Sequence, residues 1–485
     1  MKRFLCLFIL MLLVMLPMAS CNSNSNSNNN DDENIPEEDG YIADFNGANY
    51  TILAREETAY EVDNSGQGTD DKVQRKIWER NVYMKDNYNV NVAVVPCPGV
   101  YGEKATYIAK ARALTSSGAD EVSLFFTHYS YMQEMAMEGM GVALSELPQI
   151  DISADWWCEE YNDNSDVFGK NYVFVGDMGI TLYQYLEVVF FNKSLKDIYQ
   201  IGDLYQTVLD GKWTLDEMIR LSKLAVENTN TNVSDEDKQY GTLSNEHAIR
   251  AFASSLGFDY ARLNGIVNQR EMYATPPQLM DDTYEKLLAW QMSDAVRYTA
   301  SAGTDAEALN PLFANDKSLF YIQTLGEAEY LAANMNSGYG VLPYPKLDDS
   351  DSTQYHSTTR DSISGCMVAS FAQDLEMVGT ITEAMCKFAH EYITTEYYEQ
   401  RLKFRYFDDH QTKAMLDMIR ENLTFEFTQI FGDVIGRPYD SFSVVANSNA
   451  KSPESETLNH YWRSNLPTWK SGIKEMYEKF AKLGR

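Results

Sequence analysis

The sequence predicts an α/β protein of two lobes, each built on a mixed, mainly parallel sheet flanked by helices. The first observation is that short apolar segments alternate with segments of helical period along the first half of the chain. The second is length, because about 440 residues remain after a polar N-terminal stretch, more than one ordinary hydrophobic core accommodates. Strands that alternate with helices imply right-handed crossovers between parallel neighbours.

The elements of the first lobe follow from residue spacing. Val73, Ile77 and Met84 recur at the period of a helix, whereas the valines from Val90 to Val94 alternate as in a strand. The expected elements are a strand at 50–54, a helix at 71–88, a strand from 90 to 96, a helix at 104–115 and a strand at 121–126.

The N-terminus has the pattern of a secretory signal peptide at residues 1–20. Lys2 and Arg3 precede an apolar run from Phe4 to Leu16, and the small pair Ala19-Ser20 follows. A membrane-spanning helix needs roughly 20 apolar residues, so this run is too short to be one. We therefore expect the chain to be exported.

Cys21 follows the signal directly, and Met18-Ala19-Ser20-Cys21 resembles the lipobox of bacterial lipoproteins, with Met18 in place of the usual Leu. The resemblance implies that Cys21 carries a lipid that anchors the protein on the extracellular face of the cell membrane. Residues 21–43 are mostly Asn, Ser, Asp and Glu, a composition typical of a disordered tether. Ordinary signal-peptidase cleavage without lipidation is the alternative.

The net charge excludes a nucleic-acid partner. Removing Lys2 and Arg3 with the signal changes the formal charge from −31 to −33, and 71 acidic residues outnumber 40 basic ones. Binding to polyphosphate needs clustered Lys and Arg. The charge is explained by solubility outside the cell.

The cysteines outside the signal and lipobox carry no metal-site spacing. Cys97, Cys158, Cys366 and Cys386 could pair in three ways, but they lack the short paired spacing of a zinc site. Isolated buried thiols are the expected state, and no metal or cofactor is expected.

Candidate ligand-binding residues stand where the predicted strands end. Ligands of open α/β sheets bind outside the carboxyl ends of the strands. Arg55 and Glu56 follow the first strand, and His128 and Tyr129 follow the third. Ordinary loop positions are the alternative for each.

From Gly141 onward, a series of short motifs resembles family 1 of the bacterial extracellular solute-binding proteins. The motifs occur in the family's order, with Asp316 where the family usually has Gly. They are Ala143–Leu147, Gly169–Tyr172, Val188–Lys193, Lys212–Glu217, Leu312–Ser318 and Tyr339–Lys346. The Lys212–Glu217 motif also has a local explanation, because Thr214 and Glu217 form a capping box at a helix start.

The resemblance implies a periplasmic-binding-protein-like type II fold whose chain crosses between lobes more than once. It places lobe I at 44–177 and 346–405, and lobe II at 178–345 and 406–485. It further implies a monomer without catalytic residues, which closes about a hinge on a small solute and delivers it to the permease subunits of an ABC importer.

Aromatic content favours a carbohydrate or oligosaccharide as that solute. With 7 Trp, 32 Tyr and 22 Phe, the chain can supply rings that cover the apolar face of a sugar. Core packing is the alternative for each ring. The candidates are Trp156, Trp157, Tyr183 and Tyr185, together with Arg360 and Asp361 for the sugar hydroxyls. Because neighbouring residues of a strand face opposite sides, we expect one of the two tryptophans at the cleft or surface.

Two other functions fit an exported, acidic and aromatic chain: a carbohydrate-active hydrolase and a surface glycan-binding lectin. A hydrolase needs two carboxylates about 5 to 9.5 Å apart, and no motif nominates such a pair. The sequence contains neither G-x-S-x-G nor H-E-x-x-H. A rigid lectin or hydrolase would not become more compact on binding, whereas a hinged transport protein would.

Overall fold

The computed structural model describes residues 42–118, 122–226, 238–266, 268–300, 308–350, 352–407 and 409–483. The signal, Cys21 and most of the tether lie outside these residues. Tyr41–Arg485 forms one compact unit. None of the described helices is long and apolar enough to cross a membrane.

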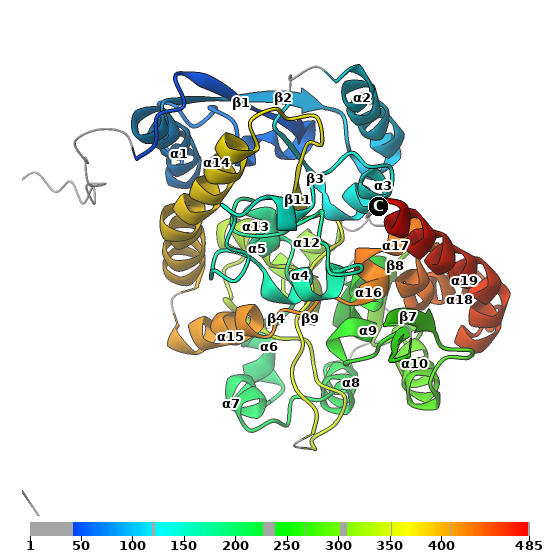
Figure 1. The fold of residues 1–485 in the computed structure, drawn as a ribbon. Helices are drawn as coiled ribbons and strands as arrows, with labels where there is room; N and C mark the ends of the chain where they lie inside the picture. The colour runs from blue at the N-terminus through cyan, green and yellow to red at the C-terminus, as the bar shows by residue number, and fades with distance from the viewer. Residues whose placement is uncertain are drawn as a thin grey trace, which may run out of the picture. The chain divides into compact units, whose positions relative to one another are not determined.

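The first sheet contains the strands expected near the N-terminus and one from late in the chain. Its order is β11 (Ser364–Val368), β3 (Leu124–His128), β1 (Ala48–Arg55) and β2 (Val90–Cys97). β1 runs parallel to β2 and β3, as predicted, and β11 runs antiparallel to β3. The helices of this part are α1 (Lys72–Tyr88), α2 (Lys104–Ser117), α3 (Tyr129–Met137) and α14 (Leu375–Phe388) (Figure 1).

The second sheet is mixed. Its order is β10 (Tyr339–Leu342), β4 (Glu187–Asn192), β9 (Ser318–Thr324), β5 (Tyr240–Asn245) and β8 (Val296–Thr299). β10, β4 and β9 alternate in direction, whereas β9, β5 and β8 are parallel. The helices around it include α8 (Leu215–Leu224), α9 (Glu246–Ser255) and α10 (Gln278–Gln291), and β6 (Ala261–Asn264) pairs with β7 (Gln269–Met272) as a hairpin.

Local sequence signals set the ends of several helices. Asp71 caps α1 by accepting a hydrogen bond from the backbone N–H of Gln74, and Gly118 ends α2 in the left-handed conformation. Thr214 caps α8 by accepting from the N–H of Glu217 at 3.2 Å, so the predicted helix start is confirmed.

Two predicted boundaries are wrong. The third strand begins at Leu124 and continues to His128, because pairing with β11 extends as far as the pair Ser364 and His128. Tyr129 is then the first residue of α3 rather than a loop residue. Later in the chain, α14 ends at Phe388 and the chain continues as a π-helix over Ala389–Tyr406.

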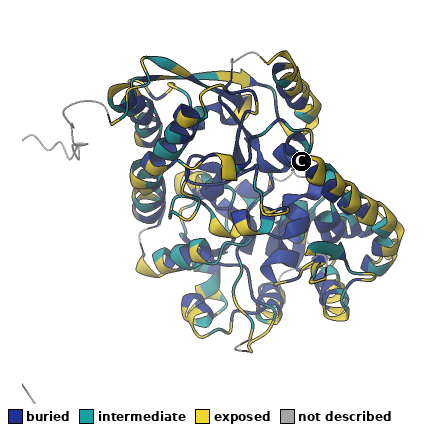
Figure 2. Ribbon diagram, in the orientation of Figure 1, coloured by how far each residue is buried: buried dark blue, intermediate teal, exposed yellow. Residues whose placement is uncertain are grey.

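The core lies in and around the two sheets. Every residue of β3, β4, β5 and β9 is buried, and the strands are coloured as buried in Figure 2. Cys97, Cys366 and Cys386 are buried thiols and Cys158 is partly buried, and all four are free, as expected.

The segments that connect the sheets are hydrogen-bonded to one another. The N–H of Glu187 donates to the carbonyl of Thr358 at 2.9 Å, and the N–H of Arg360 donates to the carbonyl of Tyr185 at 3.1 Å. We call the extended segment 357–360 the crossing strand. On its opposite edge, the N–H of Ser357 donates to the carbonyl of Asn422 at 2.8 Å. The proposed lobe boundaries therefore fall near a small ladder of extended chain, and they stay a prediction.

The C-terminal helices contact both parts. They are α15 (His410–Glu421), α16 (Phe427–Ile430), α17 (Gly432–Ile435), α18 (Ser441–Lys451) and α19 (Leu458–Leu483). α17 packs on α3 beside the first sheet, and α18 packs on α9 beside the second. Side chains from 433–443 therefore lie between the two sheets.

Candidate functional site

The carboxyl ends of β1 and β3 hold a set of buried polar side chains without hydrogen-bond partners. We call Arg55, Thr127, His128, Tyr129 and Tyr131 the strand-end group. Arg55 Nη2, Thr127 Oγ1, His128 Nε2 and the hydroxyls of Tyr129 and Tyr131 are all buried, and none has a partner among the described residues. Buried polar atoms are normally hydrogen-bonded, so this concentration at two neighbouring strand ends marks a candidate binding site.

The imidazole of His128 is held neutral by its surroundings. Burial lowers its pKa well below the ordinary value of 6.5, and the positive charge of Arg55 lowers it further. The ring of His128 stacks on that of Tyr131 with 4.4 Å between ring centroids. Arg55 and His128 end the neighbouring strands β1 and β3, Tyr129 begins α3, and Glu56 is exposed at the start of a 3-10 helix. Their contact with a ligand stays a prediction.

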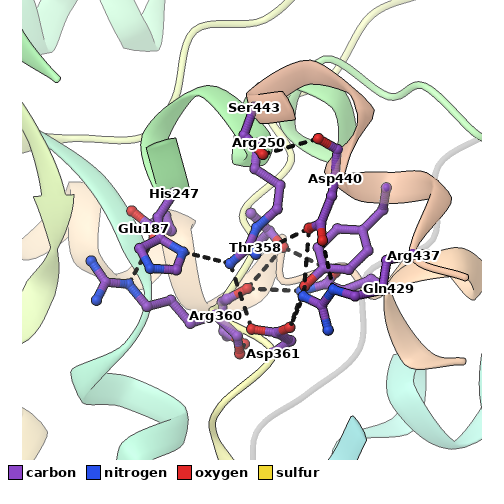
Figure 3. Close-up of polar contacts among 12 residues, drawn as sticks. Glu187, His247, Arg250, Thr358, Arg360, Asp361, Gln429, Arg437, Asp440 and Ser443 are labelled. Carbon is purple, nitrogen blue, oxygen red and sulfur yellow. Dashed lines mark hydrogen bonds and ion pairs between the residues drawn. The ribbon is translucent and has the colours of Figure 1, made fainter. Parts of the chain in front are cut away.

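A second set of polar side chains consists of two arginines, two aspartates and a tyrosine. We call Arg250, Asp361, Arg437, Tyr439 and Asp440 the interlobe cluster (Figure 3). Asp361 accepts hydrogen bonds from Arg437 Nη2 at 2.7 Å, from Arg250 Nη2 at 3.5 Å and from the hydroxyl of Tyr439. Arg250 Nη1 donates to Asp440 Oδ1 at 3.1 Å. The cluster joins the 357–360 crossing strand to α9 and to the C-terminal helices.

The charges of this cluster stabilise one another. Burial alone would raise the pKa of Asp361, but Arg250 and Arg437 outweigh burial and lower it well below 3.8. Burial likewise opposes the charge of both arginines, and the acidic groups around them raise their pKa values instead. Asp361, Arg250 and Arg437 are therefore ionised at neutral pH, and their charges compensate one another.

Arg360 and Asp361 are adjacent in the chain but have separate partners. Arg360 Nε donates to Glu187 Oε1 at 3.1 Å, and its Nη2 donates to Gln323. Both partners belong to strands of the second sheet, β4 and β9. Figure 3 shows the two side chains leaving the crossing strand in different directions.

The strand-end group and the interlobe cluster are linked through residues that neighbour them in space. Lys104 at the start of α2 pairs with Asp433 at 3.1 Å. The guanidinium of Arg437 lies 5.3 Å from the ring of Tyr101, and that ring lies 6.5 Å from the ring of Tyr131. We take the strand-end group, Tyr101 and the interlobe cluster together as the candidate site.

Trp156 and Trp157 are held away from the strand-end group by α14. Their indole N–H groups donate to the two carboxylate oxygens of Glu383, at 3.0 and 2.9 Å. Trp157 is buried and Trp156 is half-buried, consistent with the expectation that one of the pair is closer to the surface.

Tyr183 and Tyr185 also lie apart from the strand ends. The hydroxyl of Tyr183 donates to Asp177, which also accepts from His390 at 2.6 Å. Trp157 and Tyr183 line a cavity of about 420 Å³ that includes no member of the strand-end group. Tyr185 is half-buried and contributes its carbonyl to the crossing ladder.

Several residues of the site carried no sequence signal. Tyr131 follows Tyr129 by two positions and could have been found from the strand end, but Arg250, Arg437 and Asp440 come from distant segments. Arg437 has a positive φ of 55° and precedes Pro438, which places its side chain between the sheets. No local pattern announces this position.

Replacing Glu383 by Gln should destabilise the protein by about 1–3 kcal/mol, because one indole N–H then meets an amide donor instead of an oxygen. Urea unfolding followed by tryptophan fluorescence measures the change. Glu391→Gln is the matched control, since Glu391 is exposed and pairs only weakly with Lys387 at 4.0 Å. Equal stability of the two variants would contradict the assignment of Glu383.

Replacing Asp361 by Asn should lower the free energy of unfolding at pH 7 by about 3 kcal/mol, because Arg250 and Arg437 lose a buried counter-charge. The folded pKa of Asp361 is lowered, so its contribution is present above 3.8 and is lost as the pH falls below that value. The difference between wild type and variant should therefore shrink on going from pH 5 to pH 3.

Urea unfolding at several pH values tests this dependence, with Asp294→Asn as an exposed control. A difference that stays constant down to pH 3 would show that Asp361 carries no lowered pKa.

Comparison with known proteins gives matches among solved structures. No family model and no curated protein matches the chain. UgpB from Mycobacterium tuberculosis, in complex with glycerophosphocholine, has a TM-score of 0.58 at 13% identity, over 90% of this chain and 99% of that chain. The galacto-N-biose-/lacto-N-biose I-binding protein of an ABC transporter from Bifidobacterium longum has a TM-score of 0.56 at 12% identity, over 92% and 99%.

The GacH receptor of Streptomyces glaucescens, solved unliganded and with acarbose, has a TM-score of 0.53 at 13% identity, over 90% of this chain and 98% of that chain. Each match covers nearly all of both chains, and the low identity restricts the likeness to the fold. The chain has the two-lobed, periplasmic-binding-protein-like type II fold of the substrate-binding proteins of ABC importers.

Proposed function

We propose that this protein is an extracellular solute-binding lipoprotein that captures a carbohydrate between its lobes and delivers it to an ABC-type importer. The observation that carries the proposal is the strand-end group, where buried polar atoms of Arg55, His128 and Tyr131 have no partner among the described residues. These are the groups that hydrogen-bond a polar ligand. They stand at the carboxyl ends of parallel strands, where ligands of open α/β sheets bind.

Hinge closure is supported by how the lobes are connected. The crossing segments form a short extended ladder, which can bend without breaking a helix or a sheet. A ligand that touches residues from both sides binds the closed form more tightly than the open form and shifts the population toward closure. Tyr101 and Lys104 on one side and Arg437 on the other are placed for this role.

An exposed aromatic ring beside buried polar groups supports a carbohydrate as the solute. Tyr101 is 61% exposed, and its ring neighbours that of the buried Tyr131. A tyrosine ring covers the apolar face of a sugar, and the polar groups around it satisfy the hydroxyls. Two of the similar structures hold acarbose or a lacto-N-biose ligand, and a third holds glycerophosphocholine.

We propose binding without catalysis, because three acidic residues on the side of the interlobe cluster are each held in an ion pair. Asp361, Asp433 and Asp440 are each paired with arginine or lysine. A glycosidase acid needs a raised pKa, whereas the pKa of Asp361 is lowered.

Addition of the cognate sugar at 100 times its dissociation constant should raise the stability of the purified protein by about 2.7 kcal/mol. Small-angle scattering on the same sample should show a smaller radius of gyration, because the lobes close. Stabilisation without compaction would favour a rigid lectin, and release of a smaller sugar over time would favour a hydrolase.

Cys21→Ala should move the protein from the membrane fraction to the soluble fraction, because the substituted chain has no thiol to acylate. Mass spectrometry of the N-terminal peptide should find a diacylglycerol-modified Cys21 in the wild type. Cys6→Ala is the control, since that cysteine lies in the part of the signal that is removed. A wild-type protein that is already soluble would contradict lipid anchoring.

A further inference from the structure

Arg55 is a buried cation whose Nη2 has no hydrogen-bond partner among the described residues, unlike the guanidinium of the buried Arg80. Arg55 is 4% exposed. Its Nε donates to Thr58 Oγ1 at 3.2 Å, whereas its Nη2 has no hydrogen-bond partner among the described residues. Arg80, which is 0% exposed, instead donates from Nη2 to the carbonyl of Glu61 at 2.9 Å and from Nη1 to the carbonyl of Met178 at 3.5 Å. A buried charge without a partner is costly, so Arg55 requires a functional explanation.

The acidic groups near Arg55 do not supply that partner. Glu57 Oε2 lies 3.9 Å from Arg55 Nε, and its side chain is 35% exposed. Glu61 accepts from the N–H of Thr181 at 2.8 Å and from Ser364, and burial raises the pKa of its carboxyl. Asp361 is bound by Arg250 and Arg437. The guanidinium of Arg55 therefore remains available to an anion.

Two further polar groups lie at the same strand ends. His128 Nε2 and the hydroxyl of Tyr131 are buried without partners, and the two rings are stacked. Because His128 is neutral, it can donate one hydrogen bond without adding a second charge. One strong cationic donor beside two neutral groups suits a carboxylate, which accepts several hydrogen bonds on two oxygens.

An aromatic surface adjoins these donors. The exposed ring of Tyr101 lies 6.5 Å from that of Tyr131, and Lys104 Nζ lies 5.4 Å from the Tyr131 ring. A sugar ring stacked on Tyr101 could direct a substituent toward the strand ends. The exposed ring of Tyr101 and the buried guanidinium of Arg55 together fit a sugar that carries an acidic group.

We propose that the ligand is an acidic saccharide, a uronate, whose carboxylate is bound by Arg55 with Tyr131 and His128 while its ring lies against Tyr101. This inference rests on the proposed function, since it assigns a chemical class to the solute captured between the lobes. Arginine suits the task because its planar guanidinium matches the geometry of a carboxylate.

Isothermal titration with disaccharides of galacturonate, glucuronate and mannuronate, each beside its methyl ester, tests the proposal. The ester keeps the ring and hydroxyls and removes the charge. We expect at least one acid to bind about 10- to 100-fold more tightly than its ester, the range for a charge-assisted hydrogen bond.

Arg55→Met should remove most of that preference, so that acid and ester bind the variant alike. Because Met takes away a poorly compensated buried charge, the melting temperature of the ligand-free variant should not fall. Arg112→Met is the matched control: Arg112 also lies beside the first sheet, on α2, but is exposed and paired with Glu138 at 2.8 Å. It should keep the preference for the acid.

The outcomes separate this inference from the proposed function. If neutral sugars or esters bind as tightly as every acid and still compact the protein, the uronate assignment is wrong and solute capture stands. If Arg55→Met keeps the full preference, Arg55 does not bind the carboxylate. If neither acids nor neutral sugars bind, the carbohydrate function fails and this inference with it.

Discussion

The ion group around Asp361 is the interaction on which the arrangement of the candidate site depends. Asp361 lies in the turn that follows the 357–360 crossing strand, and it binds Arg250 of α9 and Arg437 of the C-terminal region at the same time. These segments are far apart in sequence, and a buried carboxylate is stable only when its charge is compensated. The pairing therefore fixes α9 and the 433–443 segment relative to the crossing strand. Removing Asp361 takes away a counter-charge that Arg250 and Arg437 share, so its loss affects both segments at once.

Charge is distributed unequally between the two faces of the site. In the interlobe cluster, cations and carboxylates satisfy one another and leave little capacity for a ligand. In the strand-end group, Arg55, His128 and Tyr131 keep buried atoms without partners among the described residues. The first face is thus suited to holding the architecture and the second to recognising a solute. The overall formal charge of −31 does not reveal this division, because solubility depends on the whole surface and recognition depends on a few buried groups.

The paired tryptophans show what a sequence argument leaves out. Alternation along the chain correctly separates a buried Trp157 from a half-buried Trp156. It does not reveal that both indoles meet Glu383, more than two hundred positions later. A carboxylate that accepts two indole hydrogen bonds accounts for their polar groups without a ligand. Tyr183 is similarly accounted for by Asp177. The sequence nominated Arg360 and Asp361 together. It did not indicate that Arg360 would bind Glu187 while Asp361 joins the interlobe cluster.

The sequence by itself determined the α/β class, the parallel strands β1, β2 and β3, the helix start at Thr214, and the candidates Arg55, His128 and Tyr129. These depend on periodicity, capping and strand ends, which are properties of short segments. Only the tertiary structure decided the antiparallel pairs β11–β3 and β4–β9, the continuation of β3 to His128, and the positions of Arg250 and Arg437. Such features arise when distant segments meet, and the free energy of a buried ion pair or a strand pair depends on a partner that local sequence does not contain. The fold class is therefore encoded in local patterns, whereas the candidate site is assembled by long-range contacts.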